Sequence, residues 1–224
     1  MRAVIVAKAK EKFVLNKNYR EFYKEQSLVD ILVGKLLTTL PADDIYLSCE
    51  DELFENVAFK HGINFVKRNP EFSSHFKENV DVIKNICSQL PKDGDLLWCT
   101  CVEPFFDEYA DILECWQQLD REQYDSLNIV YPMKKFILDQ NYNPIGFGFG
   151  HWHKYSGKVP PSFQISWATA ILSRKCIDNI GYVVGRNPYW YDSYSPVVDI
   201  DTLDDFNFAA LTYEAWKKAQ GDTI

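Results

Sequence analysis

Short apolar segments alternate with longer amphipathic ones through the first half of the chain, and this alternation restricts the possible folds more than any other feature of the sequence. Buried strands are predicted at Ala3–Ala7, Asp44–Cys49, Ile63–Arg68 and Asp95–Cys101. Helices are predicted at Ser27–Leu40, Glu50–His61, Lys77–Leu90 and about residues 106–122. Strands separated by such helices form parallel sheets that are covered on both faces. The sequence therefore predicts an α/β domain with a mostly parallel central sheet.

The second half of the chain changes character and adds an aromatic, glycine-rich stretch. Strands are predicted at Ser126–Leu138, Pro144–Phe149 and Phe163–Leu172, and an amphipathic helix at Thr202–Gln220. The stretch Gly146–Tyr155 has the composition of an arm or hairpin outside the main sheet. We expect one domain over residues 1–224, with an arm within residues 139–172 that serves dimerisation or substrate binding. Aromatic rings on such an arm predict a homodimer.

The charge and composition of the chain narrow the possible ligands. Its 224 residues carry a net charge of −8, which argues against nucleic acid as the main partner, because a phosphate backbone requires a basic surface. No apolar run approaches the length of a membrane span, so no membrane association is expected. The six cysteines lack CxxC spacing and lie mostly in apolar surroundings, which is typical of reduced cytoplasmic proteins. A cytoplasmic protein that binds a small anion is compatible with all of these features.

Lysines gather in the segment that follows the first predicted strand. The positions are Lys8, Lys10, Lys12 and Lys17, with Asn18 beside the last of them. Ligands of parallel sheets bind beyond the carboxyl ends of the strands, and lysines placed there neutralise phosphates as point charges. A solvated surface loop has the same composition, so the spacing alone leaves both interpretations open.

A group of acidic residues lies near the C-terminus, within Val197–Asp205. If this segment is a strand, Asp199 and Asp201 point to the same face. Two carboxylates on one face suit Mg²⁺, which keeps waters and substrate phosphates as its other ligands. The alternative is that Asp201 or Thr202 caps the last helix, and this alternative explains every acidic residue of the segment except Asp199.

Several segments, taken in order, resemble the cytidylyltransferase family that includes acylneuraminate (CMP-sialic acid) and CMP-KDO synthetases. Val6–Asn18 aligns without a gap with the family's P-A-R-G-G-S-K-G-I-P-R-K-N loop. Arg68–Pro70 resembles its R-P segment, and Thr100–Pro104 resembles its Q-P-T-S-P segment. Asp199–Phe206 nearly reproduces the family's D-I-D-T-L-E-D-F ending. The resemblance covers nearly the whole chain, but the loop lacks the glycines whose backbone N–H groups close around phosphates.

The resemblance implies a Rossmann-like nucleotidyltransferase fold and assigns roles by position. It implies that Asp199 and Asp201 bind Mg²⁺ and act in catalysis with Lys12 and Lys17. Together with the charge of the loop, it places the nucleoside triphosphate against Lys8, Lys10, Lys12, Lys17, Asn18, Arg68 and Asn79. The acceptor is expected near Thr100, with Glu103, Lys135 and Arg186 as further candidates for its pocket.

The expected activity is Mg²⁺-dependent transfer of CMP from CTP, or of another nucleotide from its triphosphate, to a small acidic sugar or related acid. Pyrophosphate would leave as an acceptor oxygen attacks the α-phosphorus. Two alternatives remain open at this point. One is a non-catalytic descendant that binds a nucleotide or a partner protein, because the glycines of the loop are missing. The other is a glycosyltransferase that uses its D-x-D pair to bind a nucleotide sugar.

Overall fold

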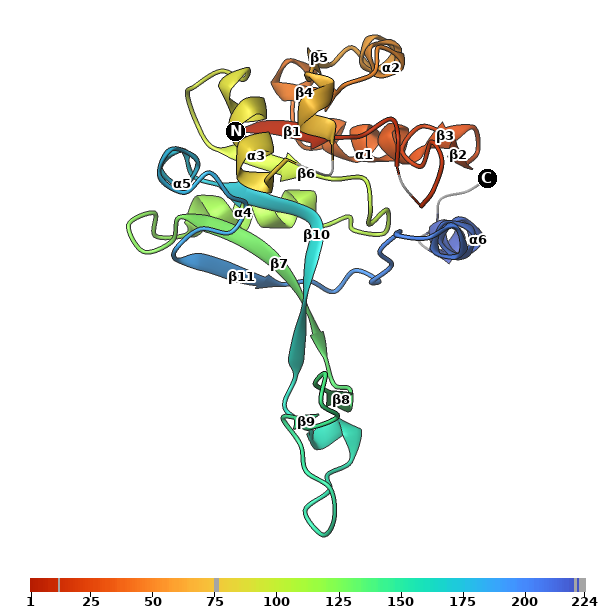
Figure 1. The fold of residues 1–224 in the computed structure, drawn as a ribbon, viewed down its shortest axis with the longest axis vertical. Helices are drawn as coiled ribbons and strands as arrows, with labels where there is room; N and C mark the ends of the chain where they lie inside the picture. Colours follow the sequence, from red (N-terminus) through yellow and green to blue (C-terminus); the bar gives the residue numbers. More distant parts are fainter. Residues whose placement is uncertain (12, 75–76, 220, 222–224) are drawn as a thin grey trace.

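The computed structural model describes residues 1–11, 13–74, 77–219 and 221. Within these residues seven strands form the central sheet: β1 (Arg2–Val6), β4 (Ile45–Cys49), β5 (Asn64–Lys67), β6 (Leu96–Cys99), β7 (Ser126–Met133), β10 (Ser162–Leu172) and β11 (Pro188–Asp192). The α-helices of the same residues are α1 (Leu28–Leu37), α2 (Leu53–His61), α3 (Asn79–Ser88), α4 (Tyr109–Gln118), α5 (Arg174–Asn179) and α6 (Leu203–Ala219). Figure 1 shows their arrangement.

The strands follow the spatial order β11-β7-β10-β6-β1-β4-β5. Of the strands described, β10 alone runs against the others, and the remaining pairings are parallel, as between Ile5 of β1 and Leu47 of β4. The prediction of a mostly parallel α/β sheet is therefore confirmed. Because parallel strands share one direction, the loops after β1, β4 and β6 meet at one edge of the sheet, which we call the carboxyl edge.

Helices cover both faces of this sheet. The face that carries Ile5 and Leu97 packs against α1, α2, α4 and α6, and both side chains are completely buried there. The opposite face, which carries Val4 and Trp98, packs against α3 and α5. Burial of one such aliphatic side chain contributes about 1.5–3 kcal/mol relative to exposure. The two layers therefore fix the sheet in place and leave its carboxyl edge open for loops.

Local sequence explains why α1 and α2 begin and end where they do. Ser27 accepts a hydrogen bond from the backbone N–H of Asp30, and Asp30 accepts one from the backbone N–H of Ser27, which is a capping box. The same Asp30 carboxylate bonds Lys60 and His61 from the last turn of α2, at 2.8 and 2.7 Å. Gly62 then ends α2 with a φ of 67°, a conformation that glycine adopts without strain.

Several elements differ from the sequence prediction. The short strand β11 and the helix α5, which has 6 residues, were not predicted, because each is too short to show a clear period. The segment that carries Asp199 and Asp201 is irregular and joins no ladder among the described strands, so the strand alternation that would place both side chains on one face does not apply there. Two small ribbons, β2 (Glu21–Tyr23) with β3 (Gln26–Ser27) and β8 (Ile137–Leu138) with β9 (Pro144–Ile145), complete the described sheets.

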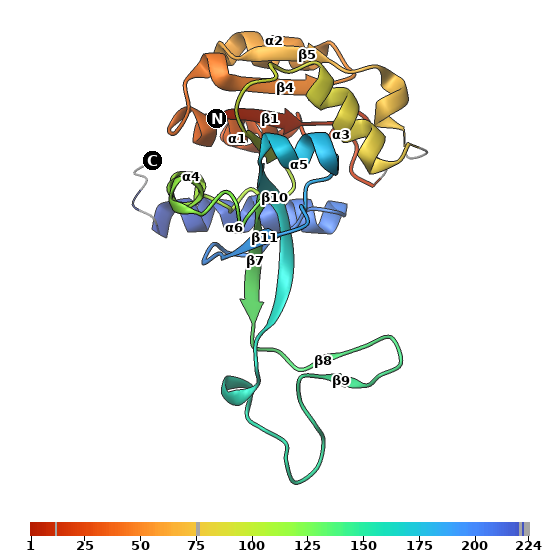
Figure 2. The same ribbon diagram turned by 90° about the vertical axis from the view of Figure 1, so that its left-hand side faces the viewer.

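An arm extends from the ends of β7 and β10, away from β4 and β5 (Figures 1 and 2). It contains β8, β9 and a 3-10 turn at Ser156–Lys158. The rings of Phe136 and Phe147 meet edge to face at 5.0 Å, and His153 stacks on Phe136 at the same distance. The inner half of β10 belongs to the central sheet, where it pairs with β6. Among the described helices, none is long and apolar enough to cross a membrane.

Candidate functional site

The segment with the two aspartates lies against the carboxyl edge and is held there at Ile200. The backbone N–H of Ile200 donates to the carbonyl of Val102, in the loop after β6, at 2.9 Å. The ammonium group of Lys17, in the loop after β1, donates to the carbonyl of Ile200 at 2.8 Å. Lys17 is only 5% exposed. The structure therefore brings the predicted pair of aspartates to the predicted basic loop. The side chain of Lys17 is buried at this contact rather than exposed to solvent.

Asp199 is half-buried, and its carboxylate lacks a full set of partners. Its Oδ1 atom is buried and has no hydrogen-bond partner among the described residues. Burial raises the pKa of Asp199 to about 6, with further contributions from the charges of Asp201 and Glu103, although Lys17 acts in the opposite direction. A buried carboxylate oxygen next to a second carboxylate is poorly solvated. A bound cation would stabilise the ionised form of this carboxylate.

The N-terminus of α6 is capped by Thr202 and Asp205. The hydroxyl of Thr202 accepts from the backbone N–H of Asp205 at 3.2 Å, and the Asp205 carboxylate accepts from the backbone N–H of Thr202 at 2.8 Å. These bonds form a capping box. Helix capping therefore accounts for Thr202 and Asp205, and it does not use the carboxylates of Asp199 and Asp201.

The chemistry of this pair suits Mg²⁺. Two carboxylates are hard oxygen ligands, and the orphaned oxygen of Asp199 is available to one more positive group. The described residues contain no group of three or more histidine, cysteine, aspartate or glutamate side chains arranged to hold a metal. An ion at this position would depend on Asp199, Asp201, waters and ligand phosphates, which is the usual coordination of Mg²⁺ beside nucleotides.

The loop after β1 is held in place by one of its own side chains and by Glu50 from the loop after β4. Asn18 is 3% exposed, and its amide donates to the carbonyl of Lys8 at 2.8 Å. The backbone N–H of Ala9 donates to the carboxylate of Glu50 at 2.9 Å. Lys10 is exposed, and Lys12 lies outside the described residues. Of the loop lysines described, Lys8 faces the cavity introduced below.

Arg68 supports this loop from below. Its side chain is completely buried, and its guanidinium donates to the carbonyl of Ala7, to the hydroxyl of Ser73 at 2.9 Å and to Glu50 at 3.1 Å. Glu50 also accepts from Ser73 at 2.8 Å. The structure does not bring Arg68 to an open surface. Instead, the hydrogen bonds of Arg68 join the loops after β1, β4 and β5.

A cavity of about 400 Å³ opens beside the loop after β1, on the side of the sheet that α3 covers. The polar residues of its lining are Lys8, Ser74, Lys77 and Asn79, and Asn79 is the first residue of α3. The rest of the wall is apolar or aromatic and comprises Val6, Val82, Ile83, Trp98, Trp167, Tyr182 and Val183. This volume falls within the range of about 300–1,000 Å³ that holds small ligands.

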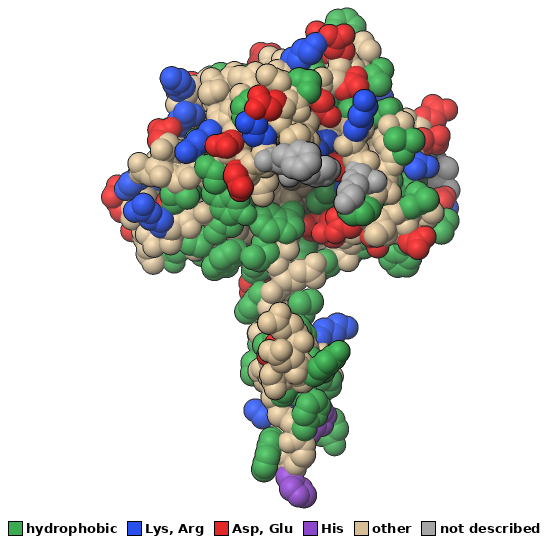
Figure 3. Space-filling view, viewed as in Figure 1, with side chains coloured by type: hydrophobic (Ala, Val, Ile, Leu, Met, Phe, Trp, Pro, Cys, Tyr) green, Lys and Arg blue, Asp and Glu red, His purple; other side chains and the backbone are tan. Residues whose placement is uncertain are grey.

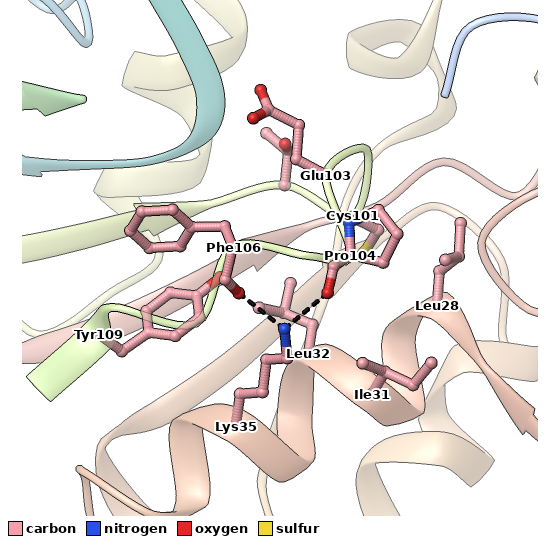
Figure 4. A pocket seen from close by; sticks show the side chains of 10 residues that line it. Leu28, Ile31, Leu32, Lys35, Cys101, Glu103, Pro104, Phe106 and Tyr109 are labelled. Atoms are coloured by element: carbon pink, nitrogen blue, oxygen red, sulfur yellow. Dashed lines mark hydrogen bonds between the residues drawn. The ribbon is translucent and has the colours of Figure 1, made fainter. Parts of the chain in front are cut away.

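The loop after β6 is fixed to its neighbours on both sides. On one side Lys35 of α1 donates to the carbonyls of Pro104 and Phe106, at 2.6 and 2.7 Å (Figure 4). Burial lowers the pKa of Lys35 to about 8. On the other side Thr100 and Glu103 bond to β10, and Figure 4 shows the Glu103 carboxylate extending away from Lys35. Thr100 and Glu103 thus use their polar atoms within the protein.

Two predicted acceptor residues lie elsewhere. Lys135 is exposed at the base of the arm, between β7 and β8. Arg186 is exposed in the loop before β11, where its backbone N–H donates to Asp125 at 2.9 Å. Asp125 directly precedes β7, so Arg186 lies at the edge of the sheet opposite the carboxyl edge. The structure does not bring Arg186 to the aspartate pair.

The sequence does not predict a role at the site for Trp98, Trp167, Tyr182, Glu50 or Lys35. Trp98 lies in an apolar strand and could not be distinguished from a core residue. A signal did exist for Trp167, because it follows Phe163 and Ile165 at every second position of β10 and so belongs to one face of a strand. Figure 3 shows hydrophobic side chains gathered on the surface around the point where the arm leaves the sheet.

No protein-family model matches the chain, and no curated protein matches it. Several solved structures have a similar fold. One is CMP:2-keto-3-deoxy-manno-octonic acid synthetase complexed with CTP, with a TM-score of 0.69 and 9% identity over 96% of this chain and 98% of that chain. Another is 4-diphosphocytidyl-2C-methyl-D-erythritol synthase from Anaerococcus prevotii, with a TM-score of 0.61 and 12% identity over 95% of this chain and 98% of that chain.

A third similar structure is a protein from Bacillus anthracis assigned as a glucose-1-phosphate thymidylyltransferase, in complex with a sucrose. Its TM-score is 0.63, and it is 13% identical over 94% of each chain. At such identities the likeness concerns the fold and not the reaction. The expected resemblance to cytidylyltransferases is confirmed at that level, and the chain shares the α/β fold of the three structures.

Proposed function

We propose that the protein is a Mg²⁺-dependent nucleotidyltransferase that transfers CMP from CTP to a small acidic sugar or related acid and releases pyrophosphate. The observation that carries the proposal is the contact at Ile200, which holds Asp199 and Asp201 against the basic loop at the carboxyl edge. The cavity with Lys8 and Asn79 opens from the same edge. Two of the similar structures carry CMP or diphosphocytidyl in their names, and one of them is complexed with CTP, which supports cytosine as the base.

Different residues would bind different parts of a nucleoside triphosphate. Lys8 faces the cavity and is placed to neutralise phosphate oxygens. Asn79 begins α3, where the amide side chain can pair with the edge of a base. Lys17 has a different task, because its ammonium group holds Ile200 and lies close enough to Asp199 to lower the pKa of that carboxyl. It positions the aspartate pair rather than binding phosphate directly.

The reaction is an in-line displacement. A hydroxyl oxygen of the acceptor forms a bond to the α-phosphorus of CTP and loses its proton to solvent. The bond from that phosphorus to the bridging oxygen breaks, and pyrophosphate leaves with the electron pair. Asp199 and Asp201 would hold Mg²⁺, which would neutralise charge on the phosphates. The protein supplies position, because Ile200, between the two aspartates, is bonded to both Lys17 and Val102.

Release of pyrophosphate tests this proposal. The protein is incubated with CTP, UTP, ATP or GTP and a panel of sugar acids, with Mg²⁺ or with EDTA. We expect release that requires Mg²⁺, prefers CTP and falls about 100-fold or more in the Asp199→Asn variant. The matched control is Asp204→Asn, which removes one exposed charge from the first turn of α6 and should keep the activity. Equal activity in the two variants would contradict the assignment of Asp199.

A second candidate is nucleotide binding without transfer. The observation in its favour is that the N–H of Ala9, where a phosphate-binding loop would offer its backbone, already donates to Glu50. Calorimetric titration with CTP separates the two candidates. Binding of CTP without pyrophosphate release from any acceptor of the panel would favour the second candidate over the first.

We also propose that the arm forms a homodimer contact. Phe149, Trp152 and Tyr155 of the arm are 61%, 72% and 83% exposed. Aromatic residues are enriched in protein interfaces, and exposed rings in such numbers are unusual on a monomer surface. A second copy of the chain would cover them. The arm is the proposed site of this contact, and the cavity beside the loop after β1 is separate from it.

A further inference from the structure

The segment that leads from β11 to α6 carries both aspartates, and we call residues 193–202 the aspartate segment. Its first residues are bonded to Glu108, which is 3% exposed. One oxygen of the Glu108 carboxylate accepts from the hydroxyls of Ser193 and Ser195 at 2.5 and 2.6 Å, and from the backbone N–H of Ser195 at 2.9 Å. Hydrogen bonds to a charged acceptor are stronger than those between neutral groups. The start of the aspartate segment is therefore held firmly at Glu108.

The far part of the aspartate segment is held by the same stretch of backbone. The N–H of Ile200 donates to the carbonyl of Val102 at 2.9 Å. Val102 and Glu108 both belong to the loop after β6, which comprises residues 100–108 and leads to α4. Because two separate parts of the aspartate segment are bonded to this one loop, the position of the aspartates depends on the position of the loop.

Lys35 of α1 holds this loop between the two attachment points. Its ammonium group donates to the carbonyls of Pro104 and Phe106 at 2.6 and 2.7 Å, and Figure 4 shows both bonds. In the sequence these two carbonyls lie between Val102 and Glu108. The side chain of Lys35 is 10% exposed. A single buried cation therefore fixes the middle of the loop that carries the aspartate segment.

The same ammonium group also contacts α6, the helix that begins directly after the aspartate segment. Its nitrogen lies 5.5 Å from the ring centroid of Trp216 and 6.0 Å from that of Tyr213. Cations within about 6 Å of an aromatic centroid are attracted to the face of the ring. The carboxylate of Asp107 lies 3.8 Å from the ammonium group on the side of the loop. Lys35 thus contacts the loop that holds the aspartates and the helix that follows them.

Stability alone does not explain why a lysine occupies this position. Burial disfavours the charged form, and it lowers the pKa of Lys35 to about 8. Replacement of buried ionic groups by apolar side chains of similar volume is often neutral or stabilising. An ammonium group has three N–H donors, which suit two carbonyls and one carboxylate at fixed positions. A need to fix the loop accounts for the lysine.

We propose that Lys35 is a positioning residue for the pair Asp199 and Asp201, because it fixes the loop to which the aspartate segment is bonded. This inference rests on the proposed function, in which the two carboxylates would hold Mg²⁺. Lys35 acts through the loop and not on the ligand. A pair of carboxylates binds a cation well only when their oxygens are held at suitable positions, so displacement of the loop weakens Mg²⁺ binding more than nucleotide binding.

Hydrogen–deuterium exchange of the full-length protein without ligands tests whether Lys35 holds the aspartate segment. Lys35→Met keeps the apolar stem and removes the ammonium group. We expect faster exchange at Ile200 and Ser195, whose N–H groups are bonded to the loop, and unchanged exchange in α3, which packs on the other face of the sheet. Equal exchange of the aspartate segment in the two proteins would overturn the proposal, and so would an equal increase in α3.

The matched control for this experiment is Lys60→Met. Lys60 lies on α2 and bonds Asp30 of α1 at 2.8 Å, so the variant removes a lysine that contacts the same helix and leaves the bonds of Lys35 in place. We expect Lys60→Met to leave the exchange of the aspartate segment unchanged. Faster exchange there, equal to that of Lys35→Met, would show that the effect is not specific to Lys35 and would overturn the proposal.

The Mg²⁺ requirement of pyrophosphate release tests the consequence for function. At pH 7, Lys35→Met should raise the Mg²⁺ concentration at half-maximal rate by at least about fivefold, with the KM for CTP changed by less than about twofold. Lys35→Arg keeps a cation with several N–H donors and should restore most of the Mg²⁺ response. An equal rise of both constants would show a general structural role and would refute positioning.

A second variant keeps the proposal testable if Lys35→Met does not fold. Glu108→Gln keeps the shape of the side chain and replaces a charged acceptor by a neutral one, which weakens the bonds from Ser193 and Ser195. We expect faster exchange of the aspartate segment and a higher Mg²⁺ requirement, as in Lys35→Met. Unchanged exchange and an unchanged Mg²⁺ requirement would show that the loop does not position the aspartates.

The two proposals fail in different ways. If exchange rises selectively in the aspartate segment of Lys35→Met but no nucleoside triphosphate yields pyrophosphate, the nucleotidyl transfer is wrong and Lys35 still positions the segment. If pyrophosphate is released with the same Mg²⁺ requirement in Lys35→Met and in the unsubstituted protein, the transfer stands and the positioning role is wrong.

Discussion

The carboxyl edge of the sheet and the arm differ in how far their functional side chains are buried. At the edge, charged groups such as Lys17, Arg68 and Glu103 are buried and bonded to partners distant in the sequence. On the arm, aromatic groups such as Trp152 and Tyr155 are mostly exposed. Buried polar groups are costly to leave unpaired, so a substitution at the edge acts on the whole protein. A substitution on the arm removes surface that the isolated chain does not bury.

The largest difference is expected from Arg68. Replacing it with alanine leaves Glu50 without its cationic partner and removes the bond to Ala7, so the free energy of unfolding should fall by about 3–5 kcal/mol. Urea denaturation followed by circular dichroism measures this loss. The comparison on the arm is Lys154→Ala, an exposed position that should stay within about 0.5 kcal/mol of the unsubstituted protein. Similar losses in the two variants would refute the contrast between the regions.

The second difference concerns pH and Lys35. Burial lowers the pKa of Lys35 from 10.5 to about 8, so between these values the unfolded chain binds more protons than the folded protein does. The free energy of unfolding should therefore rise with pH through this window, by at most about 3 kcal/mol, relative to the Lys35→Met variant. Denaturant titrations at pH 8 and at pH 10.5 measure the slope. A difference between the two proteins that does not change with pH would show that Lys35 titrates normally.

How much of this arrangement the sequence predicts depends on the distance between partners. The capping box at Ser27 and the end of α2 at Gly62 are local, so the helices they bound are predicted within a few residues. The place of Arg68 near the loop after β1 follows from the order of the strands, but its depth does not, because burial depends on Glu50 and Ser73 arriving from other loops. The hydrogen bond between Ser166 and Glu103 joins residues that are 63 positions apart, and no local sequence pattern predicts it.

A smaller effect is expected at the start of α6, where the edge becomes exposed. Replacing Thr202 with alanine removes the cap that bonds the N–H of Asp205 and should lower the free energy of unfolding by about 1 kcal/mol. The Thr202→Ser variant keeps the hydroxyl and should lose only a fraction of that amount. Thermal unfolding of the two variants gives the comparison. Because the carboxylates of Asp199 and Asp201 are not part of the cap, Mg²⁺ should change the two melting temperatures equally.

The smallest effect on stability is expected from the arm itself, although its effect on assembly should be large. The double variant Phe149→Asp with Trp152→Asp should unfold within about 0.5 kcal/mol of the unsubstituted chain when both are monomeric. Light scattering after size-exclusion chromatography should show a dimer for the unsubstituted chain and a monomer for the variant. A monomer in both cases would remove the proposed contact between arms.

The bond between Lys17 and Ile200 joins positions 183 residues apart, and this separation has a consequence for biosynthesis. A nascent chain exposes the basic loop almost at once, and the strands β1, β4, β5 and β6 are complete by residue 99. The aspartates leave the ribosome only after another hundred residues have been added. A message truncated anywhere in that interval yields a polypeptide with the cationic loop and without its acidic counterpart. The contact between these two segments can therefore form only late in translation.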